Sequence, residues 1–399
     1  MEIDGILLSG EAARRTVRRG DFVLPASVCT MKTVLPRVEF LDALQAAAGL
    51  TGGRTTKPIL SCVRLMADSD ALEVSATDGE TALRVGVPAL AVDAPGVTVV
   101  PADRLLSIVR ELPDVEIQME VVERHCVIRG AGASFRIFIL NPEDYPPTPT
   151  FEEDADLSIS GVELKRMIHL TVYAAARETS RYAINGVLWE KQDKRLYMVA
   201  TDGRRLARAG GGIAQSSNAD FSVIVPAKAL AVLERVFVAP DGDEWTVDVK
   251  VRPNQVILRS GDRVLSTVLV DGHFPKYQDV IPQGFDKQAR VGRDELLGGV
   301  RQAALLTTED SRAIKLHFES QQLVITSQSP EQGDARVELP IEYEGEPIDI
   351  GFNPAFLVDV LKVIPNEEVF IQMQEDTRPG VICGEDRKDF LYVVMPVSL

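Results

Sequence analysis

The chain has 399 residues, of which 45% are hydrophobic and 26% are charged, and its formal net charge at neutral pH is −16. These values exclude a disordered or fibrous protein, and the length is enough for two to four domains with full-sized cores. The acidity excludes a protein held on nucleic acid by a uniformly basic surface, and no apolar run approaches the roughly 20 residues of a membrane helix.

Residues 1–30 differ from the sequence that follows them. They carry four arginines between positions 14 and 19 but lack the continuous apolar segment of a secretory signal. Met31 directly precedes an alternating strand pattern. We therefore expect the fold to begin at Met31, with residues 1–30 as a loosely held extension or as the product of a start assigned too early.

From Met31 onward, each third of the chain begins with a short strand and an amphipathic helix. Apolar residues recur at three- and four-residue spacing, as at Leu164, Met167 and Ile168, which is the period of one helix face. The predicted first helices of the three thirds are 39–50, 162–175 and 294–306.

A strand–turn–strand segment follows in each third. Asp78-Gly79 and Asp202-Gly203 lie between β-prone runs, where glycine tolerates the positive φ of a tight turn, and a Ser-Pro pair takes this place in the last third. One Asp-Gly pair indicates only a turn. Its recurrence over such a distance indicates a repeat of whole domains rather than of a solenoid unit.

A second strand–helix unit then follows, at 97–112, 221–236 and 348–364. Pro101, Pro226 and Asn353 stand at matching points near the starts of these helices, where a missing N–H costs nothing. Two helices and several short strands in each third predict an α+β fold with the helices on one face of antiparallel sheets.

Two proline-rich connectors, 141–156 and 271–286, separate the thirds. The predicted organisation is an N-terminal extension followed by three similar domains. Their predicted bounds are 1–30, 31–154, 155–286 and 287–399.

No motif in the sequence supports catalysis. The stretch 52–57 lacks the Gly-Lys-Ser/Thr order of a phosphate-binding loop, and there is no Gly-x-Ser-x-Gly motif. The cysteines and histidines have no metal-ligand spacing, and the cysteines are best interpreted as reduced, buried thiols of a cytoplasmic protein. We expect no enzyme activity, no cofactor and no metal. The residues concerned are Cys29, Cys62, Cys126, Cys383, His125, His169, His273 and His317.

Three segments, together with the threefold plan, resemble the β subunit of bacterial DNA polymerase III, the sliding clamp family. They are ATDGRRLA at 200–207, VDGHFPKYQDVIP at 270–282 and YVVMPVSL at 392–399, and the resemblance extends from Met31 to Leu399. It implies a head-to-tail homodimeric ring of six domains around duplex DNA, with helices inside and sheets outside. It also implies a cytoplasmic, non-catalytic processivity factor that tethers the DNA polymerase III α subunit, the clamp loader and other replication and repair proteins, with no membrane association.

A ring is compatible with an acidic protein because topology, and not contact affinity, retains it on DNA. Sequence-independent phosphate contacts from a minority of basic residues are then sufficient. The resemblance places Arg54, Arg181, Tyr182 and Lys228 near DNA, while the alternative for each is an ordinary solvated residue. Glu178 and Ala183 depart from the family pattern and put single-strand contacts near Tyr182 in question.

The resemblance also implies a groove between the second and third domains that binds partner peptides through apolar side chains. Asp279 and Ser398 replace residues that are often basic in the family, so the groove rim is expected to prefer different peptide charges. The residues implied are Ile184, Thr201, Gly203, Arg205, Leu206, Pro275, Val280, Asn353, Phe356, Val393, Val394, Met395, Pro396 and Val397.

For the dimer contact, the resemblance pairs edge strands of the first and third domains, with Phe135 and Ile137 meeting Leu305 and Leu306 of the other protomer. A buried core role for these residues, without a dimer, is the alternative. At the level of the whole protein, the alternatives are a monomeric scaffold built from repeats and, much less favoured, a carboxylate-dependent nuclease.

Overall fold

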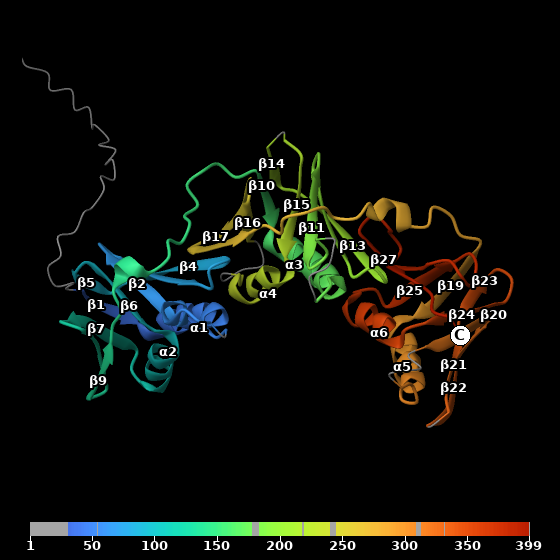
Figure 1. Ribbon diagram of the computed structural model, residues 1–399, viewed down its shortest axis with the longest axis horizontal. Coiled ribbons are helices and arrows are strands. Elements are labelled where there is room, and N and C mark those ends of the chain that lie inside the picture. The colour runs from blue at the N-terminus through green and yellow to red at the C-terminus, as the bar shows by residue number, and fades with distance from the viewer. Residues whose placement is uncertain are drawn as a thin grey trace, which may run out of the picture.

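In the computed structural model the chain is described at residues 31–53, 55–177, 183–217, 219–239, 245–308, 313–330 and 332–398. Within these residues, one unit recurs six times: a strand, a helix and three antiparallel strands (Figure 1). The first unit of each domain carries one further short strand. The sequence predicted the threefold repeat and a second strand–helix unit in each third, and the structure adds that the two units of each domain share one order of elements.

The first domain contains β1 (Lys32–Pro36), α1 (Arg37–Thr51), η1 (Pro58–Ser61), β2 (Cys62–Asp68), β3 (Ala71–Thr77), β4 (Thr81–Pro88), β5 (Ala91–Ala94), β6 (Gly96–Pro101), α2 (Ala102–Glu111), β7 (Glu116–Val122), β8 (His125–Gly130), β9 (Ala133–Phe138) and η2 (Pro142–Asp144). The second contains β10 (Leu157–Ser160), α3 (Gly161–Thr171), η3 (Val172–Ala174), β11 (Gly186–Gln192), β12 (Arg195–Thr201), β13 (Arg205–Gly212), β14 (Gln215–Ser216), β15 (Phe221–Pro226), α4 (Ala227–Val236), β16 (Thr246–Arg252), β17 (Gln255–Ser260), β18 (Arg263–Val268) and η4 (Tyr277–Val280). The third contains β19 (Lys287–Gly292), α5 (Arg293–Ala304), β20 (Ile314–Glu319), β21 (Gln322–Ser329), β22 (Gly333–Pro340), β23 (Glu342–Glu344), β24 (Ile348–Phe352), α6 (Pro354–Val363), β25 (Glu368–Met373), β26 (Gly380–Cys383) and β27 (Phe390–Val394).

The second helix of each domain begins where the sequence predicts. α2 and α4 start directly after Pro101 and Pro226, and α6 has Pro354 in its first turn. The Asn353 side chain caps α6 by accepting a hydrogen bond from the N–H of Ala355 at 2.9 Å. Proline fixes φ near its helical value, and the asparagine satisfies one of the free N–H groups, so each start is encoded locally.

The two Asp-Gly turns are built alike. In each, the preceding threonine accepts from the glycine N–H, and the aspartate accepts from the N–H groups two and three residues further on. Gly79 and Gly203 have φ values of 99° and 87°, which a side chain would strain. The turn between β12 and β13 thereby holds Thr201 and Arg205 in fixed positions.

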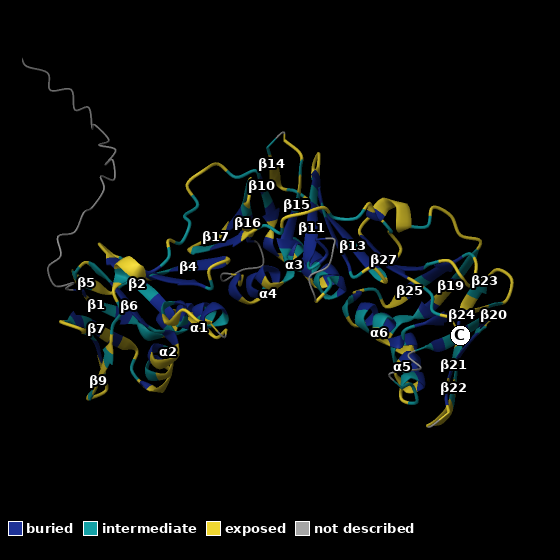
Figure 2. Ribbon diagram, viewed as in Figure 1, coloured by how far each residue is buried: buried dark blue, intermediate teal, exposed yellow. Residues whose placement is uncertain are grey.

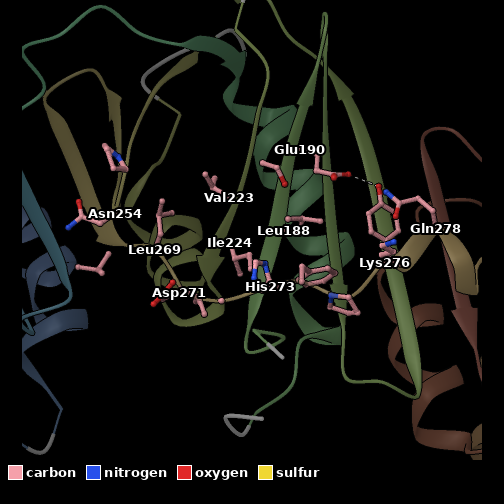
Figure 3. Close-up of a pocket in the computed structure, with 18 residues that line it drawn as sticks. Leu188, Glu190, Val223, Ile224, Asn254, Leu269, Asp271, His273, Lys276 and Gln278 are labelled. Atoms are coloured by element: carbon pink, nitrogen blue, oxygen red, sulfur yellow. Dashed lines mark hydrogen bonds between the residues drawn. The ribbon is translucent and has the colours of Figure 1, made fainter. Parts of the chain in front are cut away.

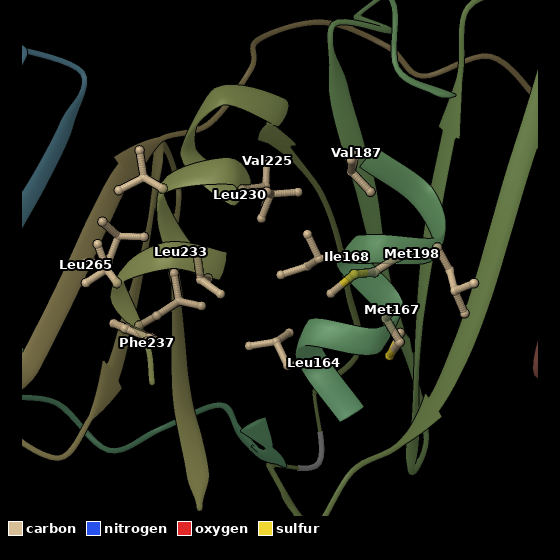
Figure 4. Close-up of a cluster of buried hydrophobic side chains, with 14 of the residues drawn as sticks. Leu164, Met167, Ile168, Val187, Met198, Val225, Leu230, Leu233, Phe237 and Leu265 are labelled. Carbon is tan, nitrogen blue, oxygen red and sulfur yellow. The ribbon is translucent and has the colours of Figure 1, made fainter. Parts of the chain in front are cut away.

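The cores lie between the helices and the inner faces of the sheets (Figure 2). In the second domain, Leu164 and Ile168 of α3 and Leu230 and Leu233 of α4 are buried and point into one cluster with side chains of the strands (Figure 4). Burying one such side chain contributes about 1.5–3 kcal/mol. This packing holds the helices on one face of the sheets, as the α+β prediction requires.

The sheets run continuously across the domain boundaries. β4 of the first domain pairs with β18 of the second, and β13 of the second pairs with β27 of the third. Each of these seams creates a nine-stranded sheet, with four strands from one domain and five from the next. Among the residue pairs that face each other across the paired strands are Leu83 with Leu265 at the first seam and Ala207 with Tyr392 at the second.

Two sheet edges equivalent to those paired at the seams remain open at the ends of the described chain. A five-stranded sheet ends at β9 in the first domain, and a four-stranded sheet ends at β22 in the third. In the residues that the structure describes, neither strand has a partner on its outer side. The three domains form an arch with the helices along the concave side and the open edges at its two ends (Figure 1).

The concave side is less acidic than the rest of the protein. The six helices of the described chain carry slightly more Lys and Arg than Asp and Glu, whereas the whole chain has 43 of the former and 59 of the latter. The excess of acid is therefore on the strands and connectors. None of the described helices is long and apolar enough to cross a membrane.

Candidate functional site: an apolar groove between the second and third domains

An apolar cavity of about 190 Å³ lies where the second domain meets the third. It receives side chains from the β12–β13 hairpin, from η4 with its preceding connector, and from the C-terminal strand β27. Most of the predicted groove residues lie together in its lining. They are Ile184, Thr201, Gly203, Arg205, Leu206, Pro275, Val280, Val393 and Met395.

Strand pairing at the seam brings the two walls together. Leu206 of β13 is directly opposite Val393 of β27, although the two are far apart in sequence. Beyond β27, the N–H of Met395 donates to the carbonyl oxygen of Arg204 at 2.9 Å, which keeps the tail beside the turn. The groove therefore exists only because the seam between the two domains is closed.

The floor and rim of the cavity differ in exposure. Leu206, Tyr277 and Val393 are buried in a small hydrophobic cluster that is separate from the main core. Val280 and Met395 at the rim are 47% and 41% exposed. A partly exposed apolar hollow that includes a flexible methionine suits the binding of varied apolar side chains.

Five predicted groove residues lie outside the lining: Asn353, Phe356, Val394, Pro396 and Val397. Val394 is buried in the main core, because neighbouring residues of a strand point to opposite faces and Val393 occupies the groove face. Asn353 caps α6, and the Phe356 ring lies over the guanidinium of Arg205, 4.6 Å from its centre. Val397 is tied to the third domain through its N–H, which donates to Gly351.

Three lining residues were not predicted: Arg204, Lys276 and Tyr277. The Tyr277 hydroxyl donates to the Glu190 carboxylate at 2.6 Å, and burial together with that carboxylate holds the pKa of Tyr277 well above its usual value. All three residues stand inside or next to segments that the sequence singled out. Their orientation toward the cavity, however, depends on the path of the connector, which has no regular period.

A larger cavity of about 640 Å³ lies beside the first and is partly lined by the connector that leads to η4 (Figure 3). Glu190, Asn254 and His273 give it a mixed polar lining. It shares Pro275, Lys276 and Tyr277 with the apolar groove. It contains no cluster of potential metal ligands among the described residues. The smaller cavity, with its apolar floor and rim, is the better candidate for a peptide site.

Three of the four predicted DNA contacts, Arg54, Arg181 and Tyr182, lie outside the described residues. The fourth, Lys228, is in the first turn of α4, and its ammonium group pairs with the carboxylate of Asp78 across the seam between the first and second domains. Burial raises the pKa of Asp78, but hydrogen bonds from Lys228 and from two backbone N–H groups outweigh that effect, and the pKa lies below its usual value. The charge of Lys228 is therefore already partly balanced by Asp78, and its contact with DNA stays a prediction.

The four predicted dimer residues lie at the two ends of the arch. Phe135 and Ile137 are on the open edge strand β9, and Leu305 and Leu306 directly follow α5. Phe135 is 37% exposed and Leu305 is 76% exposed, and Ile137 packs partly against the core. Apolar side chains of this size at an open sheet edge are a feature that proteins normally cover.

Comparisons with known proteins agree with this architecture. The described domains match, in order, the N-terminal, central and C-terminal domains of the DNA polymerase III beta subunit, at residues 31–149, 158–276 and 278–398. The chain belongs to the DNA polymerase III β subunit family, the sliding clamps. Members of this family are non-catalytic processivity factors in DNA replication.

Individual clamps match over almost the whole chain. The beta sliding clamp of Escherichia coli K12 is 33% identical over 370 residues, which cover 92% of this chain and all of that protein. Two solved clamps are also similar. That of Pseudomonas aeruginosa bound to griselimycin has a TM-score of 0.86 and 32% identity, and covers 92% of this chain and 100% of the other. That of Bacillus subtilis has a TM-score of 0.88 and 26% identity, and covers 92% and 99%.

Removing Met395 to Leu399 takes away part of the rim but leaves the strand pairing of β27 in place. We expect this truncation to abolish the binding of an apolar clamp-motif peptide, measured by fluorescence polarisation, while the mass of the assembly in solution stays the same. Val115→Ala, which shortens an exposed valine far from the groove, is the matched control and should bind normally. Unchanged peptide affinity in the truncated protein would refute the groove assignment.

Proposed function

We propose that two copies of this chain close head to tail into a ring that encircles duplex DNA, and that the groove between the second and third domains tethers replication proteins to it. These include the DNA polymerase III α subunit and the clamp loader. The protein acts in the cytoplasm, without a cofactor. The observation that carries the proposal is the complementarity of the two open sheet edges.

The two open sheets have the same numbers of strands as the two halves of an internal seam. Each internal seam joins a four-stranded half to a five-stranded half, and the open sheets have four strands at β22 and five at β9. Within each half the strand order is equivalent to that of the closed seams. Pairing β22 of one copy with β9 of a second copy therefore makes a third seam of the same kind.

The internal repeat also gives the register of this third seam. Aligning the units through their ladders places Ala335 where Leu83 and Ala207 stand, and Phe135 where Leu265 and Tyr392 stand. Phe135 of one protomer is then opposite Ala335 of its partner. In the same antiparallel register, Arg136 is opposite Asp334, and this cross-strand pair has opposite charges.

The same repetition brings the helices of neighbouring units together. α1 packs near α4 at the first seam, and α3 packs near α6 at the second. The equivalent pair at the third seam is α5 with α2 of the partner, which buries Leu305 and Leu306 at the end of α5. This agrees with the dimer contact that the resemblance to the clamp family implies for these residues.

A closed ring explains how an acidic protein stays on DNA. Its concave helices have nearly balanced charge, so they do not repel the phosphates as strongly as the outer surface does. Weak, sequence-independent contacts then permit sliding, and topology prevents dissociation. With the proposed domain bounds 31–154, 155–286 and 287–399, each domain contributes one pair of units to the ring.

The groove supplies reversible attachment. Burial of a leucine and a phenylalanine at about 1.5–3 kcal/mol each, less the cost of association, corresponds to micromolar peptide binding. Arg204 and Lys276 add positive charge at the rim, and Asp279 on η4 adds negative charge next to them. Such an affinity allows one polymerase or repair protein to replace another.

Topological retention can be measured directly. After loading by a clamp loader, the protein should remain on a nicked circular plasmid through gel filtration at high salt, and should be lost within minutes once the plasmid is cut once. Retention on the linearised plasmid would show that direct contacts hold the protein on DNA, and would overturn the proposal of a closed ring. Equal loss from both forms would favour a monomeric scaffold.

The proposed third seam can be tested by charge reversal. Arg136→Glu should raise the dissociation constant of the dimer about tenfold, since it places like charges opposite each other at two symmetric contacts, and adding Asp334→Arg in the same chain should restore it. Sedimentation velocity at decreasing protein concentration measures the change. Arg336→Glu, two residue pairs away and opposite Ser134 in the proposed register, serves as the control for the same change of charge. The proposed register is wrong if the double variant dissociates more readily than Arg136→Glu alone.

A further inference from the structure

Arg205 lies at the wall of the groove, and its side chain is 10% exposed. Its guanidinium donates to three acceptors from three separate segments. These are Asp202 Oδ2 in the β12–β13 turn at 3.0 Å, the Tyr173 carbonyl oxygen in η3 at 2.9 Å and Asp359 Oδ2 in α6 at 2.7 Å. Its central carbon also lies over the rings of Tyr173 and Phe356, at 5.6 and 4.6 Å from their centres.

A guanidinium is planar, and its five N–H donors point in fixed directions. Satisfying three acceptors at once therefore fixes the three segments relative to one another. Asp359 and Phe356 are one turn apart on α6, so two of the contacts come from the third domain. The Arg205–Asp359 ion pair thus crosses the seam directly beside the groove.

Asp359 does not line the apolar cavity. It contacts Arg205 from outside that lining, and its side chain is 39% exposed. Burial alone would lower the pKa of Arg205, but the hydrogen bond with Asp359 helps to raise it above its ordinary value. Without Asp359, the guanidinium would lose its only charged partner in the third domain among the described residues, and the cavity wall would no longer be held from that side.

We infer that Asp359 is a positioning residue for peptide binding: it holds Arg205 against the third domain and so sets the distance between the two walls of the groove. The inference rests on the proposed function of the groove. A positioning role can be distinguished from a general stabilising role, because the same seam contains a second ion pair that serves as a comparison.

That second pair joins Arg195 of the second domain to Asp389 of the third at 2.9 Å. It lies at the far end of the same strand pairing, since Asp389 precedes Phe390 of β27 and the groove is at Val394. Both pairs therefore link an arginine of one domain to an aspartate of the other across one seam. Only the Asp359 pair is next to the cavity.

The test compares Asp359→Asn with Asp389→Asn in the full-length dimer, using a fluorescein-labelled decapeptide with a C-terminal Leu-Phe pair. We expect Asp359→Asn to weaken peptide binding about tenfold and Asp389→Asn to change it by less than about twofold. Asp359→Glu, which keeps the charge, should bind more tightly than Asp359→Asn. Thermal unfolding and sedimentation of each variant report fold and assembly separately.

Equal weakening by Asp359→Asn and Asp389→Asn would overturn the inference, because it would show a general effect of the seam. Unchanged affinity in Asp359→Asn would overturn it as well. Failure of the unmodified protein to bind the decapeptide would instead reject the groove assignment itself. Measuring the unmodified protein thus distinguishes a wrong role for Asp359 from a wrong assignment of the groove.

Discussion

The pairing of one sheet edge with another across a domain boundary is the interaction on which the rest of this structure depends. An edge strand exposes a row of unpaired backbone N–H and carbonyl groups, and leaving it open invites uncontrolled association. Here that tendency is used at both internal seams, where β4 meets β18 and β13 meets β27. Each domain supplies one edge to the domain before it and one to the domain after it, so the three domains of one chain necessarily leave two complementary edges at the ends.

The peptide groove is a consequence of the same pairing. Alternation along β27 turns Leu391 and Val393 toward the outer cluster and Tyr392 and Val394 toward the main core. The paired strand β13 brings Leu206 to the same outer cluster. One backbone interaction therefore joins the domains, completes the hydrophobic core and forms the floor of the groove. Partner binding therefore depends directly on an intact pairing of β13 with β27.

The sequence determined the local features well, because local residues encode them. The helix starts at Pro101 and Pro226 and the Asp-Gly turns depend on residues within a few positions, and the structure confirms them. The continuous sheets could not be predicted in this way, since they pair strands such as β13 and β27 that are far apart in the chain and have no mutual signal in one sequence. For the same reason, the position of Val394 in the core and of Tyr277 in the cavity emerged only from the structure. The groove residues that lie together were suggested by resemblance to the clamp family and not by periodicity.

Disulfide trapping at the third seam tests the central claim most directly. Residues opposite each other in an antiparallel pair have Cβ atoms close enough for a disulfide after small adjustments, and the three described native cysteines are buried. With Phe135→Cys and Ala335→Cys in one chain and Cys29 replaced by serine, mild oxidation should convert the 43.6 kDa chain into one covalent species of twice that mass, closed by two disulfides. A ladder of longer covalent oligomers would show an open filament, and the absence of cross-linking between these positions would contradict the repeated seam.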